Sequence, residues 1–192
     1  MELSTRFEEA LIFATRLHSQ QKRKGSGIPY ISHLLSVAAL VFEYGGNEDE
    51  AISALLHDAI EDQGGDTTRQ EIRRRFGETV VEIVDGCTDA DTIPKPAWRP
   101  RKEAYIAHLS TASPAVLLVS SADKLHNVRS ILCDYRTVGE ELWQRFKAGK
   151  EGTLWYYRSL LTAYKAHGTT PLIAELERVM GELEATVAGA QR

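Results

Sequence analysis

The sequence has few cysteines, no long apolar run and no surplus of basic charge. Two cysteines among 192 residues, Cys87 and Cys133, are too few for a disulfide framework, so we expect buried free thiols in a reducing compartment. No apolar run reaches the roughly 18 to 20 residues of a membrane-spanning helix. The first residues also lack the apolar core of a signal peptide. These absences predict a cytoplasmic protein with no membrane partner.

The formal net charge of −4 gives no general electrostatic footprint for nucleic acid. The one basic run, Arg73-Arg74-Arg75, follows Glu71 on an expected helix, and a solvated helix face explains it. We therefore expect no nucleic-acid partner. The sequence carries no signal for an oligomeric state.

Helical periodicity runs through nearly every segment, and no run shows sustained strand alternation, which predicts an all-α fold. A chain of this length fits one domain, residues 1–192, and shows no internal repeat. Turn and cap signals divide it into helices. These signals are a stop at Gly45-Gly46, starts at Asn47 with Glu50 and at Thr68 with Glu71, a stop at Gly77, and starts at Ser113-Pro114 and Pro171, the last for a helix over about 171–188.

Three of the six prolines fall in one stretch, Asp89 to Arg101, which we expect to be irregular. A loop beside a functional site is often functional itself. A plain connector is an equal alternative for this segment.

Acid–base side chains are concentrated at His57-Asp58 and Glu61-Asp62, within a segment that the apolar pattern predicts to be one helix. Residues four apart share a helix face, so His57 pairs with Glu61 and Asp58 with Asp62. A buried carboxylate-rich face needs a compensating cation, and a divalent metal is the simplest. A lone His-Asp pair is more often a surface pair or a helix cap, so the interpretation depends on the rest of the chain.

Two further segments carry matching donors. His33 lies in the first turn of an apolar helix, and Asp123 and Asn127 lie one turn apart on another. A core histidine and a carboxylate paired with Lys124 are the alternatives. Two imidazoles and two carboxylates suit manganese, iron or zinc better than calcium, and the lack of a thiolate argues against a closed structural zinc site.

The order of these motifs resembles that of the HD-domain metallophosphohydrolases. Within them it resembles the hydrolase domain of Rel/Spo alarmone enzymes, and most of all the small stand-alone alarmone hydrolases. The resemblance covers about Phe7 to Tyr157. It is carried by residues 23–33 (RKGSGIPYISH), 56–62 (LHDAIED), 76–80 (FGETV) with 84–89 (VDGCTD), and 122–127 (ADKLHN).

This resemblance implies an HD-domain bundle of about eight to ten helices with a manganese ion. It implies the metal ligands His33, His57, Asp58 and Asp123, and the catalytic pair Glu61 and Asp62. Asn127 is a candidate for the ribose or a phosphate, and Tyr30 and Tyr157 for stacking on a base. Core packing is the equal alternative for Tyr157. The candidate phosphate cations are Arg23, Lys24, Lys102, Lys147 and Lys150.

Gly25-Ser26-Gly27 lengthens the loop before His33 relative to the usual family loop, so Arg23 and Lys24 remain alternatives for the family arginine. The implied reaction is metal-assisted release of pyrophosphate from the 3′ position of ppGpp or pppGpp, which leaves GDP or GTP. One rival is the same chemistry on another nucleotide, such as NADPH. A second is a nucleotide sensor without turnover, although a pure binder has no need for the Glu61-Asp62 pair.

Overall fold

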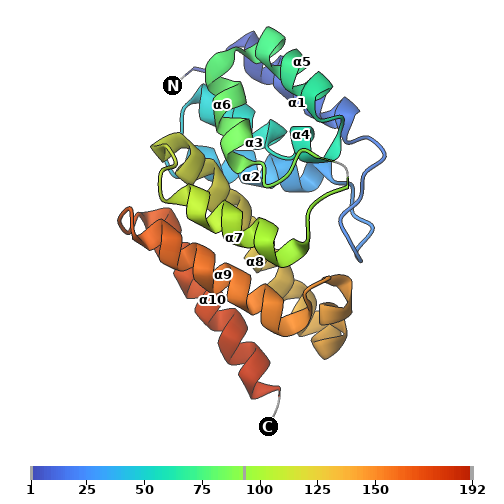
Figure 1. Cartoon of the computed structure of the whole chain (residues 1–192), viewed down its shortest axis with the longest axis vertical. Helices are drawn as coiled ribbons and strands as arrows, with labels where there is room; N and C mark the ends of the chain where they lie inside the picture. Colours follow the sequence, from blue (N-terminus) through green and yellow to red (C-terminus); the bar gives the residue numbers. More distant parts are fainter. Residues whose placement is uncertain (1, 93, 191–192) are drawn as a thin grey trace.

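The computed structural model describes residues 2–92 and 94–190, and within these ranges the chain contains ten α-helices, one 3₁₀ helix and no strand. The predicted all-α fold is therefore confirmed. Figure 1 shows α1 to α6 grouped at one end of the molecule and α9 and α10 at the other. The elements are α1 (Thr5–Leu17), α2 (Ile31–Glu43), α3 (Glu48–Leu56), α4 (Ala59–Asp62), α5 (Asp66–Phe76), α6 (Glu78–Cys87), α7 (Trp98–Leu109), α8 (Pro114–Val138), η1 (Gly139–Arg145), α9 (Gly149–Lys165) and α10 (Pro171–Gly189).

The 25-residue helix α8 organises the bundle, because it packs against α2, α3 and α6 on one side and against α10 and η1 on another. Its buried residues include Val119, Leu125 and Val128, which join a continuous apolar core. Burial of this apolar surface is the main stabilising contribution to such a bundle. The polar residue Asp123 lies on the same helix and is also buried.

Several helix boundaries follow the local signals. Asn47 caps α3 in a reciprocal capping box, in which the Glu50 backbone N–H donates to Asn47 Oδ1 (3.0 Å) and the Asn47 N–H donates to Glu50 Oε2 (2.7 Å). Ser113 caps α8 with Pro114 in its first turn, as expected. The predicted capping box of Thr68 and Glu71 is wrong, because α5 already begins at Asp66 and Thr68 Oγ1 donates to the Gln63 carbonyl instead.

The expectation of one continuous helix through His57 to Asp62 is also wrong. Helix α3 ends at Leu56 and α4 begins at Ala59, with Asp58 at φ −99° and ψ 0° between them. His57 Nδ1 donates to the Ala54 carbonyl (2.8 Å), a group that accepts from residue 58 in a continuous α-helix. The chain therefore turns at the His-Asp pair and directs both side chains toward α2 and α8.

The expectation of an irregular stretch up to Arg101 is wrong at its end, because α7 begins at Trp98 and includes Pro100 and Arg101. Residue 93 of this stretch lies outside the described residues. Pro100 is tolerated in α7 since the first N–H groups of a helix have no intrahelical acceptor.

Both cysteines are free. Cys87 is partly buried, whereas Cys133 is exposed, contrary to the expectation of two buried thiols. Among the described residues, no helix combines the length and the apolar character needed to cross a bilayer.

Candidate functional site

Four side chains from three separate segments of the sequence meet where α2, the α3–α4 turn and α8 converge. His33 Nε2 lies 3.2 Å from Asp123 Oδ1 and 3.7 Å from Asp58 Oδ2. His57 Nε2 lies 3.1 Å from Asp58 Oδ2 and 3.6 Å from Asp123 Oδ1. The two Nε2 atoms are 3.3 Å apart. The structure thus brings together all four residues predicted to bind metal.

This donor set fits a divalent transition-metal ion. Nitrogen and oxygen ligands bonded to one ion at about 2.0 to 2.2 Å must lie about 3 to 3.6 Å from one another. The separations that involve an imidazole nitrogen run from 3.1 to 3.7 Å, at the upper edge of that range. The donor atoms of His33, His57 and Asp58 all lie within 4.8 Å of one another. Two imidazoles with two carboxylates match manganese, iron or zinc rather than calcium.

Neighbouring groups fix the orientation of these donors. Because a carbonyl can only accept, the bond to Ala54 puts the His57 proton on Nδ1 and aims Nε2 at the cluster. His33 Nδ1 lies 2.7 Å from His126 Nδ1. Tyr30 donates its hydroxyl to Asp58 Oδ2 (2.5 Å).

On α8, Asn127 Nδ2 donates to Asp123 Oδ1 (2.5 Å), and Lys124 forms an ion pair with Asp123 Oδ2. Burial raises the pKa of the Asp123 carboxyl, but Lys124 and the imidazoles outweigh it and hold this pKa well below its usual range. Burial likewise opposes charge on His57, yet Asp58 and Asp123 raise the pKa of that imidazole well above its ordinary value. These carboxylates therefore remain negative and attract a cation.

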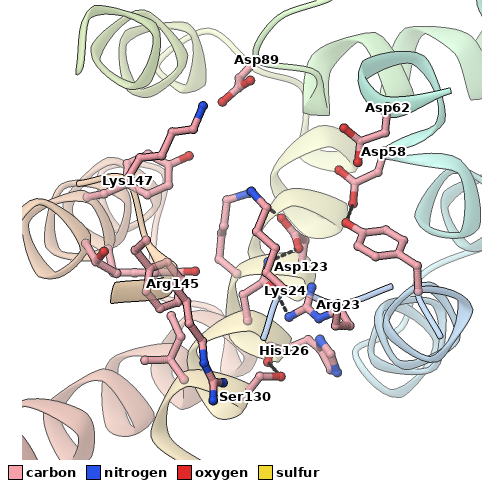
Figure 2. A pocket seen from close by; sticks show the side chains of 18 of the residues that line it. Arg23, Lys24, Asp58, Asp62, Asp89, Asp123, His126, Ser130, Arg145 and Lys147 are labelled. Atoms are coloured by element: carbon pink, nitrogen blue, oxygen red, sulfur yellow. Dashed lines mark hydrogen bonds and ion pairs between the residues drawn. The ribbon is translucent and has the colours of Figure 1, made fainter. Parts of the chain in front are cut away.

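The cluster lies beneath a cavity of about 740 Å³, within the size range of small-molecule sites. Nine Lys and Arg side chains and six Asp and Glu side chains line it, although the whole chain carries a net charge of −4. Figure 2 shows Asp58 and Asp62 on one side of the cavity, with Arg145 and Lys147 on the opposite side. Such a lining suits an anionic ligand with several phosphates.

Glu61 and Asp62 both line this cavity beside Asp58. Lys95 Nζ lies 2.7 Å from Glu61 Oε1 and 3.4 Å from Asp62 Oδ1. Burial raises the pKa of Glu61, and the negative charge of Asp89 adds to this effect despite the opposing ion pair with Lys95. A carboxyl group with a raised pKa is suited to accepting and returning a proton.

Most of the predicted substrate contacts also lie in the cavity. Arg23 Nη2 donates to Asn127 Oδ1 (2.7 Å), so the half-buried Arg23 reaches the base of the site while Lys24 lies exposed in its lining. Tyr30, Lys102, Lys147 and Tyr157 line it as well. Lys150 lies outside the lining, and its ammonium pairs with Glu140 (2.9 Å).

Sequence reasoning left the proline-rich segment open between a functional loop and a plain connector, and it named neither Lys95 nor Arg101. This segment supplies Lys95, and α7 supplies Arg101, whose guanidinium pairs with Asp89 and lies 3.7 Å from Glu61 Oε1. Asp89, with its side chain 5% exposed, also pairs with Lys102. The only available signal was the position of these charges next to prolines in a segment that follows the VDGCTD motif.

The fold and the cluster define an all-α protein with a candidate divalent-metal centre under a cationic cavity. Residues 10–154 match the family model described as HD domain. The chain belongs to the HD-domain family.

Curated relatives match about two thirds of the chain. The chain is 42% identical over 126 residues to "Guanosine-3′,5′-bis(diphosphate) 3′-pyrophosphohydrolase MESH1" of Xenopus tropicalis. The alignment covers 64% of this chain and 68% of that protein. It is 38% identical over 124 residues to a protein of Aquifex aeolicus named guanosine-3′,5′-bis(diphosphate) 3′-pyrophosphohydrolase, covering 65% of this chain but only 17% of that longer protein.

A solved structure, described as a metazoan ortholog of SpoT that hydrolyzes ppGpp, superposes with a TM-score of 0.78 at 23% identity. The superposition covers 95% of this chain and 97% of that one, and at this identity it establishes the shared fold.

Proposed function

We propose that this chain hydrolyses the 3′-pyrophosphate of guanosine alarmones, ppGpp and pppGpp, to GDP or GTP and pyrophosphate. The observation that carries the proposal is the His33–His57–Asp58–Asp123 cluster at the base of a cationic cavity, with Glu61 and Asp62 beside it. The names of the MESH1 relatives support the choice of substrate. The free thiols are consistent with a cytoplasmic location.

The four clustered side chains are the residues that would hold the divalent ion, and we propose manganese as that ion. When bound, such an ion supplies Lewis-acid activation of water and of phosphoryl oxygens. The donor set itself favours a transition metal without selecting among manganese, iron and zinc.

In the proposed reaction the oxygen of water bonds to the phosphorus that carries the 3′ oxygen. The bond from this phosphorus to the 3′ oxygen breaks. Glu61, whose pKa is raised by burial, accepts a proton from the water, and a proton reaches the 3′ oxygen as it leaves. Asp62 orients the same water. The products are the 3′-hydroxyl nucleotide and pyrophosphate.

The remaining roles follow from position. Lys95, Arg101 and Lys102 present cations next to the catalytic pair, where they can neutralise phosphate charge. Arg23 and Asn127 lie together on the α8 side of the cavity, where we place the ribose and base, with Tyr30 nearby. Tyr157 is proposed as a further wall of the base site.

A nucleotide panel tests this proposal. Purified protein with Mn²⁺ is incubated with ppGpp, pppGpp, GDP, GTP and NADPH, and the products are separated by ion exchange. We expect cleavage of ppGpp and pppGpp with pyrophosphate as the first product, and no cleavage of GDP or GTP. Equal hydrolysis of GTP, orthophosphate as the first product, or preferred cleavage of NADPH would reject the alarmone assignment.

A further inference from the structure

A polar network, buried at His18 and exposed at Asp62, connects the end of α1 to Asp62. Gln21 Nε2 lies 2.8 Å from Asp62 Oδ2. The other end of the same amide, Oε1, lies 2.6 Å from His18 Nδ1 and 2.7 Å from Gln63 Nε2. His18 is 2% exposed. The resemblance of this chain to other hydrolases assigned no role to His18, Gln21 or Gln63.

The network has only one consistent arrangement of donors and acceptors. A carboxylate oxygen accepts, so the atom of Gln21 that faces Asp62 must be the NH₂ group. Oε1 therefore faces His18 and Gln63, and both of its lone pairs are used. It follows that His18 carries its proton on Nδ1.

The other ring nitrogen of His18, Nε2, takes no part in this network. This atom is buried and has no hydrogen-bond partner among the described residues. The ring stacks on Tyr30, with centroids 5.3 Å apart and planes inclined by 21°. Among the described residues, the imidazole of His18 thus makes a single polar contact, with Gln21, and one of its faces packs against Tyr30, which contacts Asp58.

We propose that Gln21 is a positioning residue for Asp62, and that His18 and Gln63 lock the Gln21 amide in the orientation that donates to it. The inference rests on the proposed function of Asp62 in orienting water. The amide fixes Oδ2, while Lys95 Nζ lies 3.4 Å from Oδ1. The amide orients the carboxylate without placing a second cation beside it.

The first experiment replaces Gln21 by leucine and, as a matched control, replaces the exposed neighbour Gln20 by leucine. We expect Gln21→Leu to lower kcat for ppGpp by about 10- to 100-fold, the scale of misplacing a reacting group by about 1 Å. KM and the bound manganese content should stay within about twofold of wild type, because Gln21 contacts neither substrate nor metal in this role. Gln20→Leu should behave as wild type. A rise in KM with unchanged kcat would overturn the inference, because it would make Gln21 a substrate contact.

A double variant shows whether Gln21 acts through Asp62. In an Asp62→Asn background, Gln21→Leu should cause little further loss, because the carboxylate it positions is gone. Multiplicative losses in the double variant would overturn the inference.

His18 provides the rescue test. His18→Asn keeps a donor near the Nδ1 position and should retain most of kcat, whereas His18→Leu should resemble Gln21→Leu. If both His18 variants lost kcat equally at an unchanged melting temperature, His18 would not be what holds the Gln21 amide in its orientation.

A crystal structure of Gln21→Leu supplies a readout that needs no substrate. We expect the Asp62 carboxylate to rotate away from its wild-type position. An unmoved Asp62 overturns this inference, whereas failure of the wild-type protein to cleave ppGpp overturns only the proposed function.

Discussion

Each donor of the His33–His57–Asp58–Asp123 cluster has a partner that restricts its orientation. The backbone carbonyl of Ala54 holds His57, and Tyr30 holds Asp58. Such outer partners commonly change metal affinity by 10- to 100-fold when they are removed. The cluster is therefore organised before any ligand enters the cavity, which keeps the cost of binding small.

Loss of a cluster residue should remove metal and activity together. We expect His57→Ala and Asp58→Ala each to abolish stoichiometric manganese and ppGpp hydrolysis, because each removes a donor and leaves charged neighbours without a partner. Metal content is measured by plasma mass spectrometry after dialysis. His108→Ala, at an exposed histidine, is the control. Full metal occupancy and normal turnover in both variants would refute the site assignment.

Glu61 separates chemistry from binding. Glu61→Gln preserves size and removes the ability to accept a proton, so we expect kcat to fall by roughly 10² to 10⁴-fold. Manganese content and KM should be near wild type. Steady-state kinetics measure this change, with Glu103→Gln on the exposed face of α7 as the control. Unchanged turnover in Glu61→Gln would mean that the side chain is structural.

At the scale of elements, Asp89 joins the irregular segment before α7 to that helix. Its buried carboxylate pairs with Arg101 and Lys102, whose side chains are 13% and 18% exposed. We expect Asp89→Ala to lower the free energy of unfolding by about 3 kcal/mol, because two poorly solvated cations lose their counter-ion. Urea unfolding measures this loss. Glu103→Ala, which breaks an exposed pair with Arg99, should change stability by less than about 0.5 kcal/mol.

The same carboxylate predicts a pH dependence. Burial raises the pKa of Asp89, but Lys102 and Arg101 outweigh it, so this pKa is lowered overall. A lowered folded-state pKa stabilises the protein above the unfolded value of about 3.9 and loses that stabilisation as the pH falls below it. The difference between wild type and Asp89→Ala should therefore narrow as the pH falls from about 5 toward 3. A difference that grows on acidification would contradict the ion-pair explanation.

Local signals in the sequence predicted the starts of several helices correctly, but they did not predict the break between α3 and α4 at the site. The capping box at Asn47 and the Ser113-Pro114 start are local, so the sequence alone identifies them. The break between α3 and α4 depends on the His57 side chain and its tertiary surroundings, and periodicity runs through it. Lys95 and Arg101 were missed for a related reason: a proline-rich segment has no period that shows which way its side chains point.

At the scale of the whole molecule, the site depends on long-range packing. Arg23 and Asn127 are 104 residues apart in the sequence and hydrogen-bonded in the fold. Residue types alone suggested one set of metal donors drawn from three separate segments, and the resemblance to a family added the catalytic and substrate-binding roles. Residue type alone suggested Lys150 as a phosphate contact. In the fold, however, Lys150 lies outside the cavity lining and pairs with Glu140.

Because the cluster connects α2, the α3–α4 turn and α8, metal binding should stabilise the whole fold. A ligand that binds only the native state at 100 times its Kd adds about 2.7 kcal/mol. For a domain of this size, that corresponds to a rise in Tm of about 5 to 10 °C. Differential scanning calorimetry of chelator-treated protein with and without added Mn²⁺ measures the shift, and the same titration on Asp123→Asn provides the comparison. We expect the rise in wild type and its loss in the variant, since Asp123 is the donor that ties α8 to the other helices. An equal rise in both proteins would place the stabilising ion elsewhere, and no rise in wild type would mean that the cluster binds manganese too weakly to hold the three segments together.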